Sequence, residues 1–131
     1  MLSLAPSQRI LAATEPIDFR KGFDGLVAIV RDRFGEDPFA GDLFCFFNRR
    51  RDRVKILVWD RNGFWLYYKR LERGTFERVD GRAPRVEIDR AKMSMLLEGI
   101  DTRSTKFRRY FSRDVRISAR DDDRERARVA E

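Results

Sequence analysis

The most regular hydrophobic pattern in the chain lies between residues 43 and 70. Residues 43–47 are uninterruptedly apolar, which is typical of a central strand, and residues 54–60 and 64–70 alternate with period two. The stretch Arg61-Asn62-Gly63 separates these two arms, and Asn-Gly is the strongest short signal for a β-hairpin. The pattern therefore predicts an antiparallel meander of strands over residues 43–70.

Alternation divides the side chains of this hairpin between two faces. In the first arm the opposing sets are Val54, Ile56 and Val58 against Lys55, Leu57 and Trp59. In the second arm they are Phe64, Leu66 and Tyr68 against Trp65, Tyr67 and Lys69. One face is plainly core. The other carries aromatic residues and cations, and we expect it to be either half covered or used for binding.

Apolar residues at helical spacing predict a first helix over residues 19–34. Asp18 is its expected N-cap and Gly35 its expected end. Gly22 and Gly25 weaken such a helix and indicate a close approach of another backbone or a ligand, with simple tight packing as the preferred interpretation.

The remaining elements are shorter. Residues 9–13 are expected to form a strand, Phe76 and residues 86–88 to add short edge strands, and residues 90–99 to form a second helix capped by Asp89. Together the elements predict an α+β fold, in which a mainly antiparallel sheet, a β-meander with an Asn-Gly hairpin, is packed by two helices.

Length and composition limit the possible domain organisation of the chain. With 131 residues the chain fits one domain, and a hydrophobic content of 42% supplies a core. We expect residues 1–101 to form a single α+β domain. Residues 102–131 are highly charged with few apolar anchors, so we expect a flexible C-terminal tail.

Missing residue types exclude several kinds of chemistry. The chain has no His, which removes Ser-His-Asp and Cys-His arrangements and nearly all zinc sites except carboxylate ones. Cys45 is the only cysteine and lies in an apolar run, which favours a buried residue in a reducing, cytoplasmic protein. The sequence shows no membrane-spanning segment and no secretory signal. We expect no catalytic residue, no metal and no cofactor.

One carboxylate set, Asp18, Asp24 and Asp60, could in principle hold Mg²⁺ for phosphodiester chemistry. Each member has a simpler interpretation: a helix cap, a residue on the polar side of a helix, and the first residue of a tight turn. A metal-dependent nuclease is therefore the weakest of the functions considered.

Basic residues concentrate in the hairpin. The net charge of the chain is +7, and residues 49–73 hold nine basic residues against three acidic ones. Cations with aromatic residues between them suit a phosphate backbone whose bases or sugars stack on the rings. The alternative is a solvated hairpin whose Trp and Tyr pack under long Arg side chains. The charge clustering favours contact with nucleic acid.

The motifs, taken in order, resemble a known family. They are EPIDFRKGFDGL, DPFAGDLFCFFNRRRDRVKILVWDRNGFWLYYKRLERGTF and MSMLLEGID, and the match covers about residues 2–101. This order resembles the small TnpB-type accessory protein of the insertion-sequence-sixty-six family of bacterial transposons. Glu77-Arg78-Val79 depart from it, because the family usually has a Trp-Pro pair there, and residues after Asp101 match nothing in it.

The resemblance implies a non-catalytic helper of transposition, encoded beside a separate DDE transposase. Its expected partners are the DNA of the transposon ends and the transposase, in the bacterial cytoplasm and on the nucleoid when the protein is bound to DNA. The alternative is an adaptor that docks the transposase without touching DNA, with the nuclease as a third choice. The oligomeric state is left open.

The candidate site residues divide by role. Phosphate contacts are expected from Arg49, Arg50, Arg51, Arg53, Lys55, Lys69 and Arg70, with a further phosphate site at Arg20 and Lys21. Stacking or buttressing is expected from Trp59, Trp65, Tyr67 and Tyr68. Structural roles are expected for Asp18, Gly22, Gly25, Asp60 and Gly63.

Overall fold

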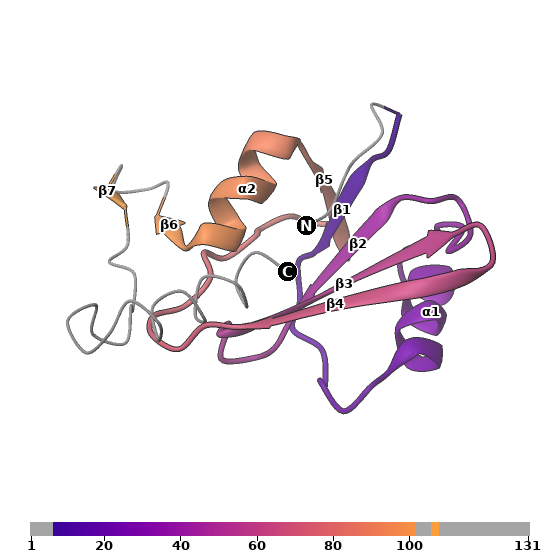
Figure 1. The fold of residues 1–131 in the computed structure, drawn as a ribbon, viewed down its shortest axis with the longest axis horizontal. Helices are drawn as coiled ribbons and strands as arrows, with labels where there is room; N and C mark the ends of the chain where they lie inside the picture. The colour runs from indigo at the N-terminus through magenta and orange to yellow at the C-terminus, as the bar shows by residue number, and fades with distance from the viewer. Residues whose placement is uncertain (1–6, 102–105, 108–131) are drawn as a thin grey trace, which may run out of the picture.

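The apolar segments form five strands of a single sheet through the centre of the molecule (Figure 1). The computed structural model describes residues 7–101 and 106–107. In spatial order β4-β3-β2-β1-β5, the strands are Gly63–Arg70 (β4), Arg53–Asp60 (β3), Leu43–Phe47 (β2), Ile10–Ala13 (β1) and Arg85–Ile88 (β5). Neighbours are antiparallel except for β1 and β2, which run parallel. The predicted α+β class with a mainly antiparallel sheet is confirmed.

The hairpin of β3 and β4 forms where the sequence predicted it, but its loop is one residue shorter. Asp60 pairs with Gly63, which leaves Arg61 and Asn62 as the loop. Arg61 adopts a left-handed backbone with φ of 50°, and the Asn62 amide donates to the Asp60 carbonyl. A three-residue loop would have set Asp60 opposite Phe64. Because side chains alternate, the shorter loop moves every β4 side chain to the other face.

This register splits the aromatic residues of the hairpin. On one face Trp65, Tyr67 and Lys69 lie beside Val54, Ile56 and Val58. On the other face Phe64, Leu66 and Tyr68 lie beside Lys55, Leu57 and Trp59. The expected single face of aromatics and cations is therefore corrected, since each face carries two of the four stacking candidates.

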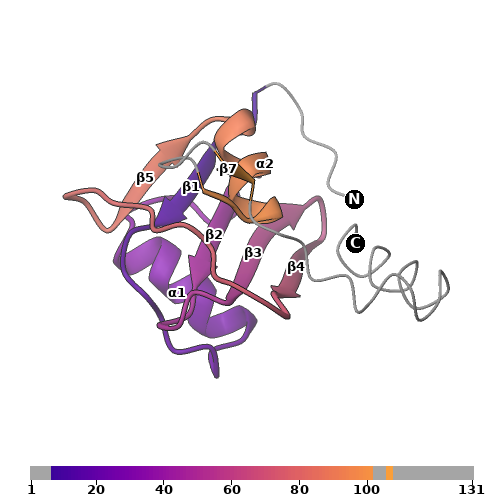
Figure 2. The ribbon, with the colours of Figure 1, turned by 90° about the vertical axis from the view of Figure 1, so that its left-hand side faces the viewer.

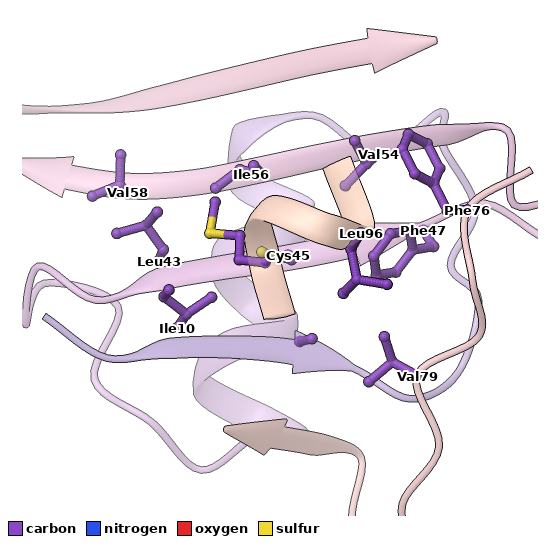
Figure 3. Close-up of a cluster of buried hydrophobic side chains, with 12 residues drawn as sticks. Ile10, Leu43, Cys45, Phe47, Val54, Ile56, Val58, Phe76, Val79 and Leu96 are labelled. Atoms are coloured by element: carbon purple, nitrogen blue, oxygen red, sulfur yellow. The ribbon is translucent and has the colours of Figure 1, made fainter. Parts of the chain in front are cut away.

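Both faces of the sheet are covered (Figure 2). Helix α1 (Phe23–Asp32) packs on one face, where its apolar side chains meet those of β2 and β3. Helix α2 (Arg90–Glu98) and residues 71–84 cover the other face. Figure 3 shows the core under α2, which is built from Ile10, Leu43, Cys45, Phe47, Val54, Ile56, Val58, Phe76, Val79 and Leu96. The interior is thus two apolar layers, one on each side of the sheet.

The first helix is shorter at both ends than the predicted span of residues 19–34. Helix α1 begins after Gly22, which occupies the N-cap position without a side-chain hydrogen bond. Asp18 does not cap the helix; its carboxylate accepts a hydrogen bond of 2.9 Å from the Arg20 amide. The helix starts late because the carbonyl groups of this segment bind Lys55 of β3.

The second helix agrees closely with the predicted span. Asp89 caps α2 by accepting a hydrogen bond of 2.7 Å from the Lys92 amide, and Gly99 ends the helix with φ of 77°. The predicted edge strand at 86–88 is present as β5. Phe76 belongs to no strand; it is buried against Phe47, with ring centroids 5.7 Å apart.

The end of the described chain holds a second, two-stranded sheet formed by β6 (Ile100–Asp101) and β7 (Lys106–Phe107). The predicted flexible tail over residues 102–131 lies outside the described residues, apart from 106–107.

Candidate nucleic-acid interface

Strand direction brings three basic segments to one end of the sheet. Because β3 is antiparallel to both β2 and β4, the end of β2, the start of β3 and the end of β4 lie together. Residues 17–21 join them, since the Ile17 amide donates a hydrogen bond of 3.0 Å to the Phe47 carbonyl at the end of β2. We call residues 17–21, 48–53 and 69–73 the cationic end. They hold nine basic residues against three acidic ones.

Lys55 holds the first of these segments in place. Its ammonium donates hydrogen bonds of 2.8 Å to the carbonyl oxygens of both Phe19 and Lys21. The same ammonium lies 4.9 Å from the ring centroid of Phe19 and 5.2 Å from that of Tyr68. Lys55 is only 5% exposed. The expectation of a surface cation at this position is therefore corrected, and its role is to position the loop that carries Arg20 and Lys21.

Asn48 organises the second segment. Its side-chain oxygen accepts hydrogen bonds of 3.0 Å from the amides of Asp52 and Arg53, and its amide nitrogen donates to Asp52 at 2.6 Å. Asn48 was not among the site residues predicted from the sequence, although an Asn that opens a polar turn is a recognisable turn signal. The turn directs Arg49 and Arg50 outward, and both are exposed.

Arg51 turns inward from the same tight segment. Its backbone is left-handed, with φ of 60°, and its guanidinium donates to the carbonyls of Phe76 and Glu77 at 3.3 and 2.6 Å. The guanidinium carbon also lies 4.6 Å from the ring centroid of Phe47. Burial lowers the pKa of Arg51. This residue fixes residues 76–77 to the turn, and the expected phosphate contact is corrected.

Arg53 and Arg70 face each other directly across β3 and β4. Arg53 donates a hydrogen bond of 3.1 Å to the Tyr68 hydroxyl, and Arg70 pairs with Glu72 at 2.8 Å. Two opposed cations repel each other, so this pair adds positive potential at the end of the hairpin. An anion bound here would relieve that repulsion.

Arg20 projects from the loop beside them. Its side chain is 91% exposed and pairs with Asp18 at 2.6 Å. The hydrogen bonds from Arg20 hold the pKa of Asp18 at about 2. Asp18 is a partner of Arg20 and not the helix cap that the sequence predicted.

Lys69 lies on the opposite face from Arg70. Its ammonium donates a hydrogen bond of 2.5 Å to the Leu97 carbonyl near the end of α2. Burial lowers the pKa of Lys69. This contact joins the hairpin to α2 and takes Lys69 away from the exposed part of the cationic end.

The stacking candidates form no common platform. Trp59 packs edge to face against Phe39 and Phe64, with centroids 5.0 Å apart in both cases. Trp65 stacks on Tyr67 at 6.2 Å on the other face. Trp65 and Tyr68 are 56% and 51% exposed, on opposite sides of β4.

The other residues predicted to have structural roles lie in different surroundings. A Cβ atom at Gly25 would lie 3.0 Å from that of Lys21, which accounts for glycine by tight packing, whereas Gly22 and Gly63 have open space. Asp60 accepts a hydrogen bond of 3.2 Å from the Trp65 indole.

Three features of the described residues bear on metal binding, thiol reactivity and membrane insertion. Among them, no group of three or more His, Cys, Asp or Glu could hold a metal ion. Burial raises the pKa of Cys45 to about 12. No helix in this part of the chain has the length and apolarity needed to cross a membrane.

Comparisons with known proteins connect this arrangement to a family. The chain is 38% identical over 100 residues to "Uncharacterized protein y4jC" of Sinorhizobium fredii, covering 75% of this chain and 86% of that one. It is 35% identical over 103 residues to "Uncharacterized protein y4hO" of the same organism, covering 79% and 90%. No solved structure is significantly similar to it. The family model described as "IS66 Orf2 like protein" matches residues 8–107, so the chain belongs to this accessory-protein family associated with the transposition of insertion sequences.

Proposed function

We propose that this protein is a non-catalytic accessory factor of transposition that binds element DNA, or the transposase–DNA complex, through the cationic end. The observation that carries the proposal is the convergence of three basic segments, which are distant in sequence, at one end of the sheet. Family membership supplies the biological setting. In this proposal the protein acts in the bacterial cytoplasm, on the DNA of the transposon ends.

The exposed cations give this end its capacity for anions. Arg49 and Arg50 are exposed, and neither forms an ion pair with a residue that the structure describes. Each is free to contact a phosphate, and such contacts release counterions from DNA. Arg20, Lys21, Arg53 and Arg70 extend the surface on either side. Lys55 and Arg51 support it from inside.

The acidic residues of the cationic end neutralise only part of its positive charge. Asp18 and Glu72 pair with Arg20 and Arg70, and Asp52 is bound to Asn48. A phosphate can compete for the exposed guanidinium groups because surface ion pairs contribute little in water. The arrangement favours contact with the backbone of a nucleic acid over readout of bases, because the cationic end is formed by loops and strand ends and contains no helix that could enter a groove.

Salt-dependent binding tests the proposal. Binding of a fluorescent duplex carrying an element end is measured by anisotropy over a range of salt concentrations, for the wild type and for Arg49→Ala/Arg50→Ala. The proposal predicts weaker binding by the double variant and a salt slope reduced by about two, or one phosphate contact for each Arg. Loss of DNA binding with an unchanged circular dichroism spectrum supports the proposal.

The matched control removes the same charge from positions outside the cationic end. Arg31 in α1 and Arg90 in α2 are both exposed, and Arg31→Ala/Arg90→Ala is expected to bind like the wild type. Equal losses in both double variants, or binding that is flat with salt, would show that the cationic end is not a specific surface. Nicking of the duplex that depends on Mg²⁺ would contradict the non-catalytic role.

A second function is favoured by the aromatic cluster at the other end of the hairpin. Phe39 is 55% exposed and its ring lies 5.0 Å from that of Trp59 and 5.5 Å from that of Phe64. An adaptor could dock the transposase on this cluster without touching DNA. Retention of purified transposase by the wild type but not by Phe39→Ser, together with no DNA binding, would favour the adaptor.

A further inference from the structure

The sheet has one long strand whose outer edge has no partner in the described chain. β4 is the first strand of the order β4-β3-β2-β1-β5 and has eight residues, Gly63–Arg70. Figures 1 and 2 show it at the margin of the sheet, with no described element beside it. An exposed strand edge presents unpaired amide and carbonyl groups, which form a template for another strand.

The backbone groups that point outward from β4 can be assigned. The Leu71 amide donates a hydrogen bond of 2.8 Å to the Asp52 carbonyl of the neighbouring segment. Because such bonds involve alternate residues of an antiparallel pair, the odd-numbered residues of β4 bond to β3. The outward groups therefore belong to Phe64, Leu66, Tyr68 and Arg70.

The two edge strands of the sheet differ in how well they are protected against pairing with another strand. The other edge, β5 (Arg85–Ile88), is short and carries the charged residues Arg85 and Glu87, as edges that avoid association commonly do. The five central residues 64–68 of β4 carry no charge. Trp65 and Tyr68 expose more than half of their surface, one on each face of this edge.

We propose that β4 is a self-association edge that pairs antiparallel with β4 of a second copy of this chain. The result is a two-fold symmetric dimer with a continuous sheet of ten strands, five from each copy. A pairing centred on Leu66 sets Trp65 of each copy opposite Tyr67 of the other on one face, and Phe64 opposite Tyr68 on the other face. Aromatic pairs of this kind stabilise antiparallel strands.

Charge selects a second copy in this orientation. The end of β4 carries Lys69 and Arg70 beside Arg53, whereas the start of β4 lies next to Asp60. Parallel pairing would set the basic ends of two copies side by side. Antiparallel pairing keeps the two basic ends apart and places each next to the hairpin loop of the other copy, where Arg61 lies 3.9 Å from Asp60. A nucleic acid is a poor occupant because the central residues offer it no cation.

The oligomeric state in the absence of DNA and transposase tests this proposal. Sedimentation velocity of the full chain over a range of concentrations is expected to show a species of twice the 15.6 kDa chain mass. Trp65→Lys puts a cation on the exposed edge and should weaken self-association by at least about tenfold. Glu87→Lys puts a cation on the other edge and should leave self-association unchanged.

A backbone variant separates strand pairing from side-chain contact. Leu66→Pro removes an outward amide, which the proposed pairing uses and the pairing with β3 does not. It should give a folded monomer; if it does not fold, Trp65→Lys carries the test alone. A wild type that is monomeric up to its solubility limit overturns the proposal. So does a dimer that Trp65→Lys leaves intact, or one that forms only after transposase or DNA is added.

Discussion

Lys55 in β3 donates a hydrogen bond of 2.8 Å to the carbonyl oxygen of Phe19, 36 residues earlier in the chain. A second bond of equal length reaches the Lys21 carbonyl. Because these bonds hold residues 19–21 outside the helix, they determine both where α1 begins and where Arg20 and Lys21 lie. A buried lysine thus determines the position of two exposed cations.

Removing this ammonium should destabilise the fold. Lys55→Met leaves two carbonyls without a donor, and we expect the free energy of unfolding to fall by about 2–3 kcal/mol. Urea denaturation measures the change. Lys21→Met, at an exposed position, should change the free energy by less than about 0.5 kcal/mol. Equal effects of the two variants would show that Lys55 does not hold the loop.

Alanine substitutions at the three consecutive arginines should differ in their effect on the free energy of unfolding. Arg51 bonds two carbonyl groups and stacks on Phe47, so Arg51→Ala should lower the free energy of unfolding by about 2–3 kcal/mol. Arg49→Ala and Arg50→Ala remove exposed side chains and should stay within about 0.5 kcal/mol of the wild type. Thermal or urea unfolding of the three single variants checks this, and a uniform effect along the three would contradict it.

The hairpin and the second helix could be predicted because their signals are local. Period-two alternation locates the strands, and the residue before α2, Asp89, is a good N-cap whose hydrogen bond to the Lys92 amide is formed within one turn. The register between the two hairpin arms was harder to predict. It depends on whether Asp60 faces Gly63 or Phe64, and a one-residue difference in the loop exchanges the faces of β4.

The site was less predictable because it depends on contacts between distant segments. Apolar spacing extends the first helix back to Phe19, whereas in the structure the carbonyl groups of Phe19 and Lys21 bind Lys55 and the helix begins after Gly22. Three identical side chains in a row give no indication of which one turns inward. The left-handed backbone of Arg51 and the carbonyl at Phe76 decide this, and neither can be inferred from residue type.

The Asp18 carboxyl should titrate at unusually low pH. Its pKa is about 2 because Arg20 donates several hydrogen bonds to it, and Arg20→Ala should move it toward the ordinary value of 3.8. A folded-state pKa below the unfolded one gives stability that is present above the unfolded pKa and is lost as the pH falls through about 2. Carbon-detected NMR titration measures the pKa directly. A pKa unchanged by Arg20→Ala would contradict the assigned cause.

Lys69 should produce a pH dependence of the same sign on the alkaline side. Burial lowers its pKa below the ordinary 10.5, so the unfolded chain binds the proton more tightly than the folded one. Stability relative to Lys69→Met should therefore rise as the pH increases from the lowered pKa to 10.5. Paired denaturation curves over this range test the sign. A difference that stays constant or falls would show that the ammonium is not desolvated.

The central claim is that three segments form one nucleic-acid surface, and amide hydrogen exchange with and without element-end DNA tests it most directly. We predict that DNA slows exchange together in residues 17–21, 48–53 and 69–73, and leaves α2 and the Arg61-Asn62 loop unchanged. At the same sub-saturating DNA concentration, the slowing should be smaller in Arg49→Ala/Arg50→Ala than in the wild type. Protection confined to other parts of the described chain, or none in these three segments at saturating DNA, would contradict the account.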